Sequence, residues 1–360
     1  MLKNITPART LFLSVEGVAA IMKKKGAAAC IEGIAHYINE DFLRWEDFDK
    51  TARVASHSDD GVIELMPIAD KETYTFKYVN GHPRNSRFGL STVMAFGVLS
   101  DVETGTPELL SELTLTTAMR TAAMSAVAAK ALAKPEPKSM ALIGNGAQSE
   151  FQALAFSHLL GVKRFHLYDV DPSATTKLQR NLDQLGLESQ AFSSTRDAVQ
   201  GTDIVTTVTA DKTNATIITP DMIEPGMHIN GVGGDCPGKT ELHRDVLKEA
   251  RVFVEYEPQS RVEGDVQQMP PDFPVTEIWR VLAGHAPGRQ SPDDVTIFDS
   301  VGFALEDFSA LRFMRDVATT LDLCESISLV PALENPRNLF GFAYEKNAGQ
   351  TRPLRDVVAY

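Results

Sequence analysis

A glycine-rich loop in the second half of the chain carries residues that could do chemistry. The stretch from Gly231 to Leu242 reads GVGGDCPGKTEL. Its GGDCPGKT portion fits the phosphate-binding pattern of a glycine, four residues and then Gly-Lys-Ser/Thr. An apolar run (Met227 to Val232) precedes the loop and a helix-like segment (Glu241 to Ala250) follows it. That order is the one an ATPase or GTPase loop requires.

Two residues inside this loop disagree with a triphosphate cradle. Pro237 removes one of the N–H groups that would hold phosphate, and Asp235 places a negative charge where phosphate would lie. A carboxylate there can instead act as an acid or a base. The alternative for Asp235 is a local role as a helix cap or turn residue.

A second glycine turn lies earlier, in MALIGNGAQSEFQALAF, where Gly144 and Gly146 stand between an apolar run and a helical one. Such a turn lets backbone N–H groups approach a pyrophosphate at a helix N-terminus. The third glycine of the dinucleotide pattern is replaced near Ser149, so a bare tight turn is the alternative. Asp169, about twenty residues on, can accept hydrogen bonds from ribose hydroxyls. Asp171 would repel a 2′-phosphate, which favours NAD over NADP.

The elements that must position these residues fall into two groups. A helical segment from about Ser14 to Phe48 is followed, over residues 50–112, by the short alternating runs ARVASHS, VIELMPIA, YTFKYVN and TVMAFGVLSD, which predict a mainly antiparallel sheet. An alanine-rich helix is expected over residues 114–133. Beyond it strands alternate with helices: SMALIG, RFHLYDV, DIVTTVTA, MHINGVGG, RVFVEYE and VTIFDSVG predict a parallel, doubly wound sheet. Ala304 to Leu323 is expected to be helical, to pack back on the first sheet and to be followed by no further strand.

The predicted fold class is therefore α/β: a Rossmann-type domain plus an α+β, mainly antiparallel domain for substrate and dimerisation. We expect the first domain to comprise residues 1–133 and 318–360, and the dinucleotide-binding domain to comprise residues 134–317. In this arrangement the GGDCPGKT loop follows the fourth strand of the parallel sheet, beside the reacting end of a dinucleotide. A second phosphate cradle there would be redundant.

Composition excludes several classes of partner and points to a cytoplasmic protein. The chain has 360 residues with 43% apolar content, enough for about two domains, and its formal charge of −13 argues against nucleic-acid binding. Its three cysteines include no C-x-x-C pair, so neither a disulfide framework nor a metal site is expected. No apolar stretch approaches the roughly 18 residues of a membrane span, and Glu16 interrupts the first apolar run too soon for a signal peptide.

Several long stretches resemble the ornithine cyclodeaminase/mu-crystallin family. They are KTARVASHSDDGVIELMPIADK, FKYVNGHP, TVMAFGVLSDVETGTPELLSELT, MALIGNGAQSEFQALAF, TVTADKTNATIITPDMIEPGMHINGVGGDCPGKTELH and FDSVGFALED. The resemblance runs from about Phe42 to Phe308 and does not reach the first dozen residues or the tail after about Leu323. It implies a homodimeric enzyme that converts L-ornithine to L-proline and ammonia. In that reaction a hydride passes from Cα of ornithine to NAD, the δ-amine closes the ring, ammonia leaves and the hydride returns.

The resemblance also implies roles for particular residues. Asp235 matches the catalytic carboxylate, which takes a proton from the α-ammonium. The positions that match substrate contacts are Arg53, Lys77, Arg120, Glu64, Met66 and Val301. The positions that match cofactor contacts are Thr92, Arg120, Gly144, Gly146, Ala147, Gln148, Asp169, Thr209, Ile229, Asn230, Gly231, Val232, Lys239 and Ser300. The three cations would clamp the substrate α-carboxylate, and Glu64 would pair with the δ-ammonium.

Other functions on the same scaffold stay open at this point. They are a lysine cyclodeaminase, a ketimine or imine reductase, an amino-acid dehydrogenase, and a mu-crystallin-like protein that binds a small ligand together with a dinucleotide. The set of three cations with Glu64 and Asp235 favours ornithine cyclisation. His57 and His82 lie near these residues in the sequence and are expected to be structural.

Overall fold

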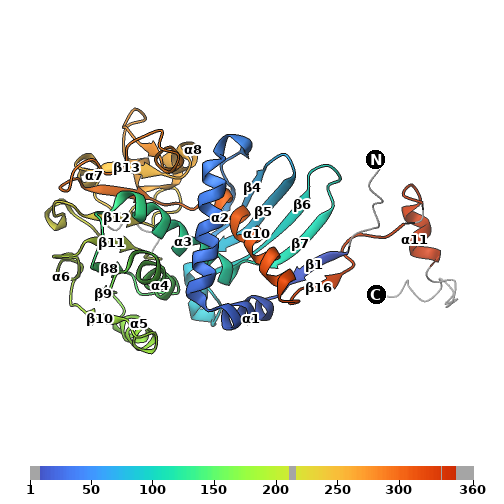
Figure 1. Ribbon diagram of the computed structural model, residues 1–360, viewed down its shortest axis with the longest axis horizontal. Coiled ribbons are helices and arrows are strands. Elements are labelled where there is room, and N and C mark those ends of the chain that lie inside the picture. The colour runs from blue at the N-terminus through green and yellow to red at the C-terminus, as the bar shows by residue number, and fades with distance from the viewer. Residues whose placement is uncertain (1–8, 211–215, 334, 346–360) are drawn as a thin grey trace.

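Two β-sheets lie side by side in the computed structural model, with the long helices α2 (Ala27–Leu43) and α3 (Thr114–Leu132) between them (Figure 1). The structure describes residues 9–210, 216–333 and 335–345. The predicted α/β class, with one parallel and one mainly antiparallel sheet, is confirmed.

The first sheet has the strand order β16-β1-β7-β6-β5-β4-β2, with β3 paired to β4. Its pairs are antiparallel except for β1 with β7. The strands are β1 (Thr10–Leu13), β2 (Asp49–Lys50), β3 (Val54–His57), β4 (Val62–Ala69), β5 (Thr73–Gly81), β6 (Val93–Asp101), β7 (Pro107–Glu112) and β16 (Glu325–Ile327). The expectation of no strand after the last long helix was wrong, because β16 pairs with β1. Its ESI sequence is short and largely exposed, so it carries no alternating pattern.

The second sheet is parallel throughout and has the order β10-β9-β8-β11-β12-β15-β13-β14. The strands are β8 (Ser139–Ile143), β9 (Arg164–Tyr168), β10 (Glu188–Ala191), β11 (Ile204–Thr207), β12 (His228–Gly231), β13 (Arg251–Val254), β14 (Thr276–Glu277) and β15 (Thr296–Asp299). Strands β10 and β14 were not predicted, because their residues ESQA and TE form no apolar run. Successive strands are added on one side of β8 as far as β10 and on its other side from β11 onward. Doubly wound sheets bind their ligands at such a switch in strand order.

Helices cover both faces of the parallel sheet and one face of the other. The remaining helices are α1 (Val15–Lys25), α4 (Ser149–Leu160), α5 (Pro172–Gln184), α6 (Thr195–Val199), α7 (Arg244–Lys248), α8 (Glu257–Glu263), α9 (Ile278–Leu282), α10 (Ala304–Thr320) and α11 (Leu339–Glu345). Alternate residues of the parallel strands belong to two different apolar clusters: Leu142 packs with the α3 and α4 side, whereas Ile143 packs with the α6 and α7 side. Burial on both faces explains why these strands read as continuous apolar runs.

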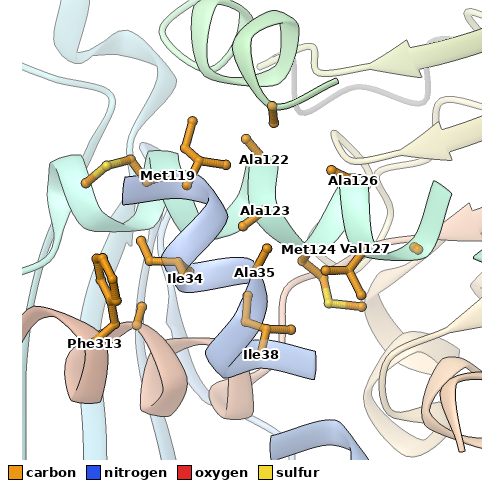
Figure 2. Close-up of a cluster of buried hydrophobic side chains, with 14 of the residues drawn as sticks. Ile34, Ala35, Ile38, Met119, Ala122, Ala123, Met124, Ala126, Val127 and Phe313 are labelled. Atoms are coloured by element: carbon orange, nitrogen blue, oxygen red, sulfur yellow. The ribbon is translucent and has the colours of Figure 1, made fainter. Parts of the chain in front are cut away.

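The centre of the molecule is an apolar contact between three helices (Figure 2). Ile34 and Ile38 of α2 meet the small side chains of α3, such as Ala122 and Ala123, and Phe313 of α10 closes the cluster. Alanine lets α3 approach its neighbours closely, so the alanine-rich run predicted as a helix is nearly all buried. This cluster also includes side chains of the parallel sheet, so the two sheets share one core.

Helix α10 packs against β4, β5 and β6, as expected for the last long helical segment. The domain limits at 133/134 and 317/318 stay a prediction, and the second of them falls within α10. Across the described residues, none of the helices combines the length and apolarity needed to cross a lipid bilayer.

Candidate functional site

The glycine turn after β8 has the geometry that a dinucleotide-binding turn requires. Gly144 has φ of 92°, and a Cβ there would lie 2.9 Å from the carbonyl oxygen of Val208, so no other residue fits well. In place of the third glycine, the Ser149 hydroxyl donates a 2.8 Å hydrogen bond to the Gly144 carbonyl. Asp169, at the end of β9, accepts the Asn145 N–H at 2.5 Å. The two parts of the sequence pattern therefore meet at one edge of the sheet.

The space beside this turn fits a phosphate group. A Cβ at Gly146 would meet no protein atom within 4 Å, so packing does not demand glycine there. Ala147 and Gln148 follow at the N-terminus of α4, where N–H groups are not used by the helix. The Gln148 Oε1 atom is buried without a hydrogen-bond partner among the described residues. The open glycine and the helix N-terminus together suit a bound pyrophosphate, and the Gln148 oxygen can accept from a hydroxyl group.

The GGDCPGKT loop is held by buried carboxylates beneath it. Glu241 accepts hydrogen bonds from the N–H groups of Thr209 (3.0 Å) and Gly233 (2.9 Å). Asp265 in turn accepts the N–H groups of Glu241 and Leu242 at 2.8 and 2.9 Å. These bonds tie the loop after β12 to the segment that follows β11. The loop is therefore built into the edge of the sheet by residues that lie outside the pattern itself.

Lys239 does not have the place of a triphosphate-binding lysine. Its Nζ lies 3.0 Å from the Thr209 carbonyl and 3.2 Å from Asp235 Oδ1, and its side chain is only 5% exposed. The following helix α7 begins at Arg244, so Lys239 is not at a helix N-terminus. Burial alone would lower the pKa of Lys239, but Asp235 and Glu241 outweigh it and the pKa is raised. Lys239 is thus a fixed positive charge next to Asp235.

Asp235 is the exposed member of this pair, with 53% of its side chain accessible. Its charge acts on Arg53, a residue of the other sheet's domain. The structure therefore brings the predicted catalytic carboxylate, from the end of a central parallel strand, to the predicted substrate cations. No group of three His, Cys, Asp or Glu residues within the described part of the chain is arranged to hold a metal ion.

Arg53 lies between β2 and β3, and its side chain is buried among carboxylates and carbonyls. Its Nη1 donates to Glu64 at 3.0 Å and its Nε lies 3.0 Å from Glu263. Its Nη2 donates to the carbonyls of Val301 (2.5 Å) and Gly302 (2.6 Å). Burial alone would lower the pKa of Arg53, but the surrounding carboxylates raise it. The guanidinium therefore ties the first domain to the turn after β15 and stays charged.

Lys77 and Arg120 share a counter-ion that the sequence did not single out. Asp307 lies 2.7 Å from the Lys77 Nζ and 3.1 Å from the Arg120 Nε, and Glu306 accepts from the Arg120 Nη1 at 2.5 Å. Burial, followed by the nearby Arg120, lowers the pKa of Lys77 to about 8. Arg53 lowers it further, so the three predicted cations do lie close together.

The remaining predicted residues differ in how they are placed. Met66 and Val301 are buried, at 2% and 6% exposed, and Met66 follows Glu64 on the same inward face of β4. The Ser300 hydroxyl donates to Glu255 at 2.7 Å. Thr92 lies just before β6, where its carbonyl accepts the His82 N–H.

The β12 segment predicted to contact a cofactor is largely interior. The side chain of Ile229 is fully buried in the apolar core, and the Asn230 amide donates to Thr206. Their main chains pair with β11 and β15, so the end of the strand at Gly231 and Val232 is the part of this segment nearest to a ligand at the sheet edge.

Sequence reasoning missed the acidic residues that surround the predicted site. Glu255 accepts from the N–H groups of Val301 and Gly302, and burial raises its pKa to about 8. Glu263 faces Arg53, and Asp307 neutralises Lys77. Asp307 had a signal, since it stands beside Glu306 in the quoted stretch FDSVGFALED. The others lie far from the cations in sequence and are brought to them by the fold.

The fold and this site define an α/β protein of two sheets, with a dinucleotide-type turn and a charged site between residues of the two sheets. Residues 16–321 match the ornithine cyclodeaminase/mu-crystallin family. The chain belongs to that family.

Individual relatives cover almost the whole chain. An ornithine cyclodeaminase from Agrobacterium fabrum is 56% identical over 345 residues, which are 96% of each chain. A solved structure of a lysine cyclodeaminase, described as recognising L-lysine, L-ornithine and L-2,4-diaminobutyric acid, superposes with a TM-score of 0.88. It is 28% identical, and the match covers 93% of this chain and 99% of that one. An archaeal alanine dehydrogenase dimer with bound NAD gives a TM-score of 0.82 at 28% identity, over 89% and 100% of the two chains.

Proposed function

We propose that this protein is an NAD-dependent ornithine cyclodeaminase, which converts L-ornithine to L-proline and ammonia. The observation that carries the proposal is the meeting of Arg53, Lys77 and Arg120 with Asp235 at the edge of a sheet that also carries the dinucleotide turn. The 56% identity to a relative of that name, over nearly the full length, supports it.

NAD would be held by the turn after β8 and by Asp169. The N–H groups at the start of α4 suit its pyrophosphate, and Asp169 suits the hydroxyls of its adenosine ribose. When bound, NAD supplies a hydride acceptor that can later return the hydride. Asp169 is followed by Asp171, and a second carboxylate there disfavours the additional phosphate of NADP.

The substrate α-carboxylate would bind to the buried cations. The Lys77 ammonium has three N–H donors and gives one of them to Asp307, so it can also donate to an incoming carboxylate. Arg53 is held at the carbonyls of Val301 and Gly302 and therefore cannot move far toward the substrate. Orientation of Cα by such a fixed clamp is what hydride transfer requires.

Asp235 would take the proton of the α-ammonium. Its partial exposure keeps it in contact with water, so a proton can pass on from it to solvent. Lys239 holds its carboxylate in place through a 3.2 Å contact. Glu64, buried on β4, would attract the δ-ammonium.

The test is incubation of the purified protein with L-ornithine and catalytic NAD. Proline and ammonia are expected in equal amounts with no lasting rise of NADH absorbance. Continuous NADH accumulation would indicate an amino-acid dehydrogenase, and turnover of L-lysine in place of ornithine would change the substrate. Tight dinucleotide binding without turnover of either amino acid would support a binding protein like mu-crystallin.

We also propose that the protein is a homodimer formed through the outward face of the first sheet. On β4 the inward residues include Glu64, whereas the outward Ile63 and Leu65 are 41% and 45% exposed. Leu65 lies opposite Tyr78, and the Tyr78 ring stacks on Phe96 with centroids 5.0 Å apart. A continuous apolar row across three strands is typical of an interface between subunits.

The dimer is tested by light scattering on the wild-type protein and on a Phe96→Glu variant. A charge in the apolar row should convert a dimer into monomers, whereas Glu72→Gln, on the turn between β4 and β5, should leave the mass unchanged. A monomeric wild-type protein would refute the proposal. We further propose a cytoplasmic location, which suits three cysteines that form no C-x-x-C pair.

A further inference from the structure

A carboxylate that neither the sequence pattern nor the family resemblance singled out lies within the site. Glu263 is the last residue of α8, and its side chain is 7% exposed. Its Oε2 lies 3.0 Å from the Arg53 Nε but makes no aligned hydrogen bond among the described residues. The Oε1 of Glu64 is likewise buried without a hydrogen bond there. Both carboxylates thus have an oxygen available to a further donor.

The charges around Arg53 do not balance. Glu64 and Glu263 are both buried against its guanidinium, so two buried carboxylates face one fixed positive charge. Asp235 also acts on Arg53, but it is half exposed and has Lys239 as its own partner. Burying unbalanced negative charge is costly unless a cation or a proton completes the site. The distal ammonium of a diamino acid is a cation of the right kind.

The proposed reaction itself needs two proton acceptors. The α-ammonium loses one proton as the Cα hydride leaves, and the δ-ammonium must lose another before its electron pair can form the N–Cα bond. When the former α-nitrogen leaves, it takes both electrons of its bond to Cα. The two stored protons then return, one to ammonia to give ammonium and one to the ring nitrogen of proline. One carboxylate holds only one proton at a time, so a second acceptor beside the δ-ammonium lets the ring close before Asp235 has released its proton to water.

We propose that Glu263 is this second acceptor, a catalytic residue that removes the proton from the δ-ammonium while Asp235 serves the α-ammonium. Glu64, hydrogen-bonded to Arg53, holds the δ-ammonium in place. The inference rests on the proposed ornithine cyclodeaminase function and names the residue that takes the proton released for ring closure.

The electrostatics agree with this role. Burial, only partly offset by Arg53 and reinforced by Glu64 and Asp235, raises the pKa of Glu263 to about 7. A carboxylate with a raised pKa holds a proton better than an exposed glutamate does, which makes it the stronger base. The charged groups that act on Glu263 come from the segment after β2 (Arg53), from β4 (Glu64) and from the loop after β12 (Asp235).

The experiment compares wild type, E263Q, E263D and the control E257Q by stopped-flow absorbance of NADH. Glu257 lies on the same helix but pairs with Arg261, and its side chain is 44% exposed. Rising absorbance reports hydride loss from ornithine, and falling absorbance reports its return after ring closure. E263Q should keep the rising phase within about threefold and slow the falling phase by about 10²-fold or more, as loss of a general base does. E257Q should match wild type in both phases.

A pH series separates proton transfer from a structural effect. The deficit of E263Q should shrink about tenfold for each pH unit between about 7.5 and 9.5, because a free ammonium of pKa near 10 then supplies more neutral amine itself. E263D should recover part of the falling phase, and it carries the test if E263Q does not fold.

A falling phase within about threefold of wild type, a deficit that does not change with pH, or a loss confined to the rising phase would overturn the role of Glu263. In each of these cases wild type still makes proline, so the proposed function stands. Failure of the wild-type protein to form proline from ornithine would instead refute the proposed function and this inference with it.

Discussion

Replacing Asp235 by asparagine should remove activity and leave the fold intact. The asparagine has the same shape and its side-chain oxygen can still accept from Lys239, so the 3.2 Å contact can persist. The contact involves a side chain that is 53% exposed, and ion pairs of that kind contribute about 0–1 kcal/mol. We therefore expect the melting temperature to fall by no more than about 4 °C.

The expected loss of turnover is far larger. An asparagine cannot take a proton from the α-ammonium, and removal of a general base lowers rates by about 10²–10⁴. The assay measures proline formation, with NAD affinity by fluorescence titration and thermal unfolding recorded on the same preparation. NAD affinity should stay within about threefold of wild type, since the predicted pyrophosphate site lies at α4.

Asp245→Asn is the matched control, because Asp245 is also an exposed aspartate paired with a lysine, 2.6 Å from Lys248 on α7. It should change neither stability nor turnover. Near-normal turnover of Asp235→Asn would remove Asp235 from the mechanism. A large loss of stability or of NAD binding would show that the residue is structural.

Three further predictions follow from the described geometry. Gly144→Ala should lower the free energy of unfolding by about 1–3 kcal/mol in denaturant titrations, because the φ of Gly144 is 92° and a Cβ there would contact backbone atoms. Gly146→Ala should keep the stability and weaken NAD binding about tenfold, and the reverse pattern would refute the assignment of the turn. Asp169→Ser should raise the ratio of NADP to NAD affinity about tenfold in fluorescence titrations, and an unchanged ratio would show that Asp169 does not contact the ribose. Burial lowers the pKa of His228 to about 3, so below about pH 6.5 the unfolded chain binds a proton that the folded chain does not, and the stability falls as the pH drops. In denaturant titrations His228→Gln should reduce the loss of stability between about pH 6.5 and 5 by roughly 2 kcal/mol, and an unchanged loss would contradict the buried neutral histidine.

Local patterns in the sequence account for most of the elements of the fold. The alternation in VIELMPIA predicts β4 over the residues where it is observed, and the alanine-rich run predicts α3 to within one residue. These patterns are strong because each segment has one consistent environment, either a half-buried strand or a buried helix. The strands β10, β14 and β16 lack such a pattern and form because the sheets offer them an edge to pair with.

The helix-like segment after the GGDCPGKT loop shows a second limit. Residues 241–250 carry helix formers, but α7 covers only Arg244–Lys248. Leu242 instead forms a bridge with Ile218, and the N–H groups of Glu241 and Leu242 are taken by Asp265. Contacts with distant residues thus override local helix propensity at the first turn.

The sequence by itself determined the two kinds of sheet, the dinucleotide turn and the family, because each depends on short-range periodicity or on contiguous motifs. It also predicted Asp235 and the three cations as site residues. Only the tertiary structure decided what those charges face. Asp307 joins Lys77 to Arg120, and Glu263 meets Arg53 from a helix more than two hundred positions away in the chain. Electrostatic interactions depend on distance and burial, which no linear pattern encodes, so the acidic partners of the site became visible only when the chain was folded.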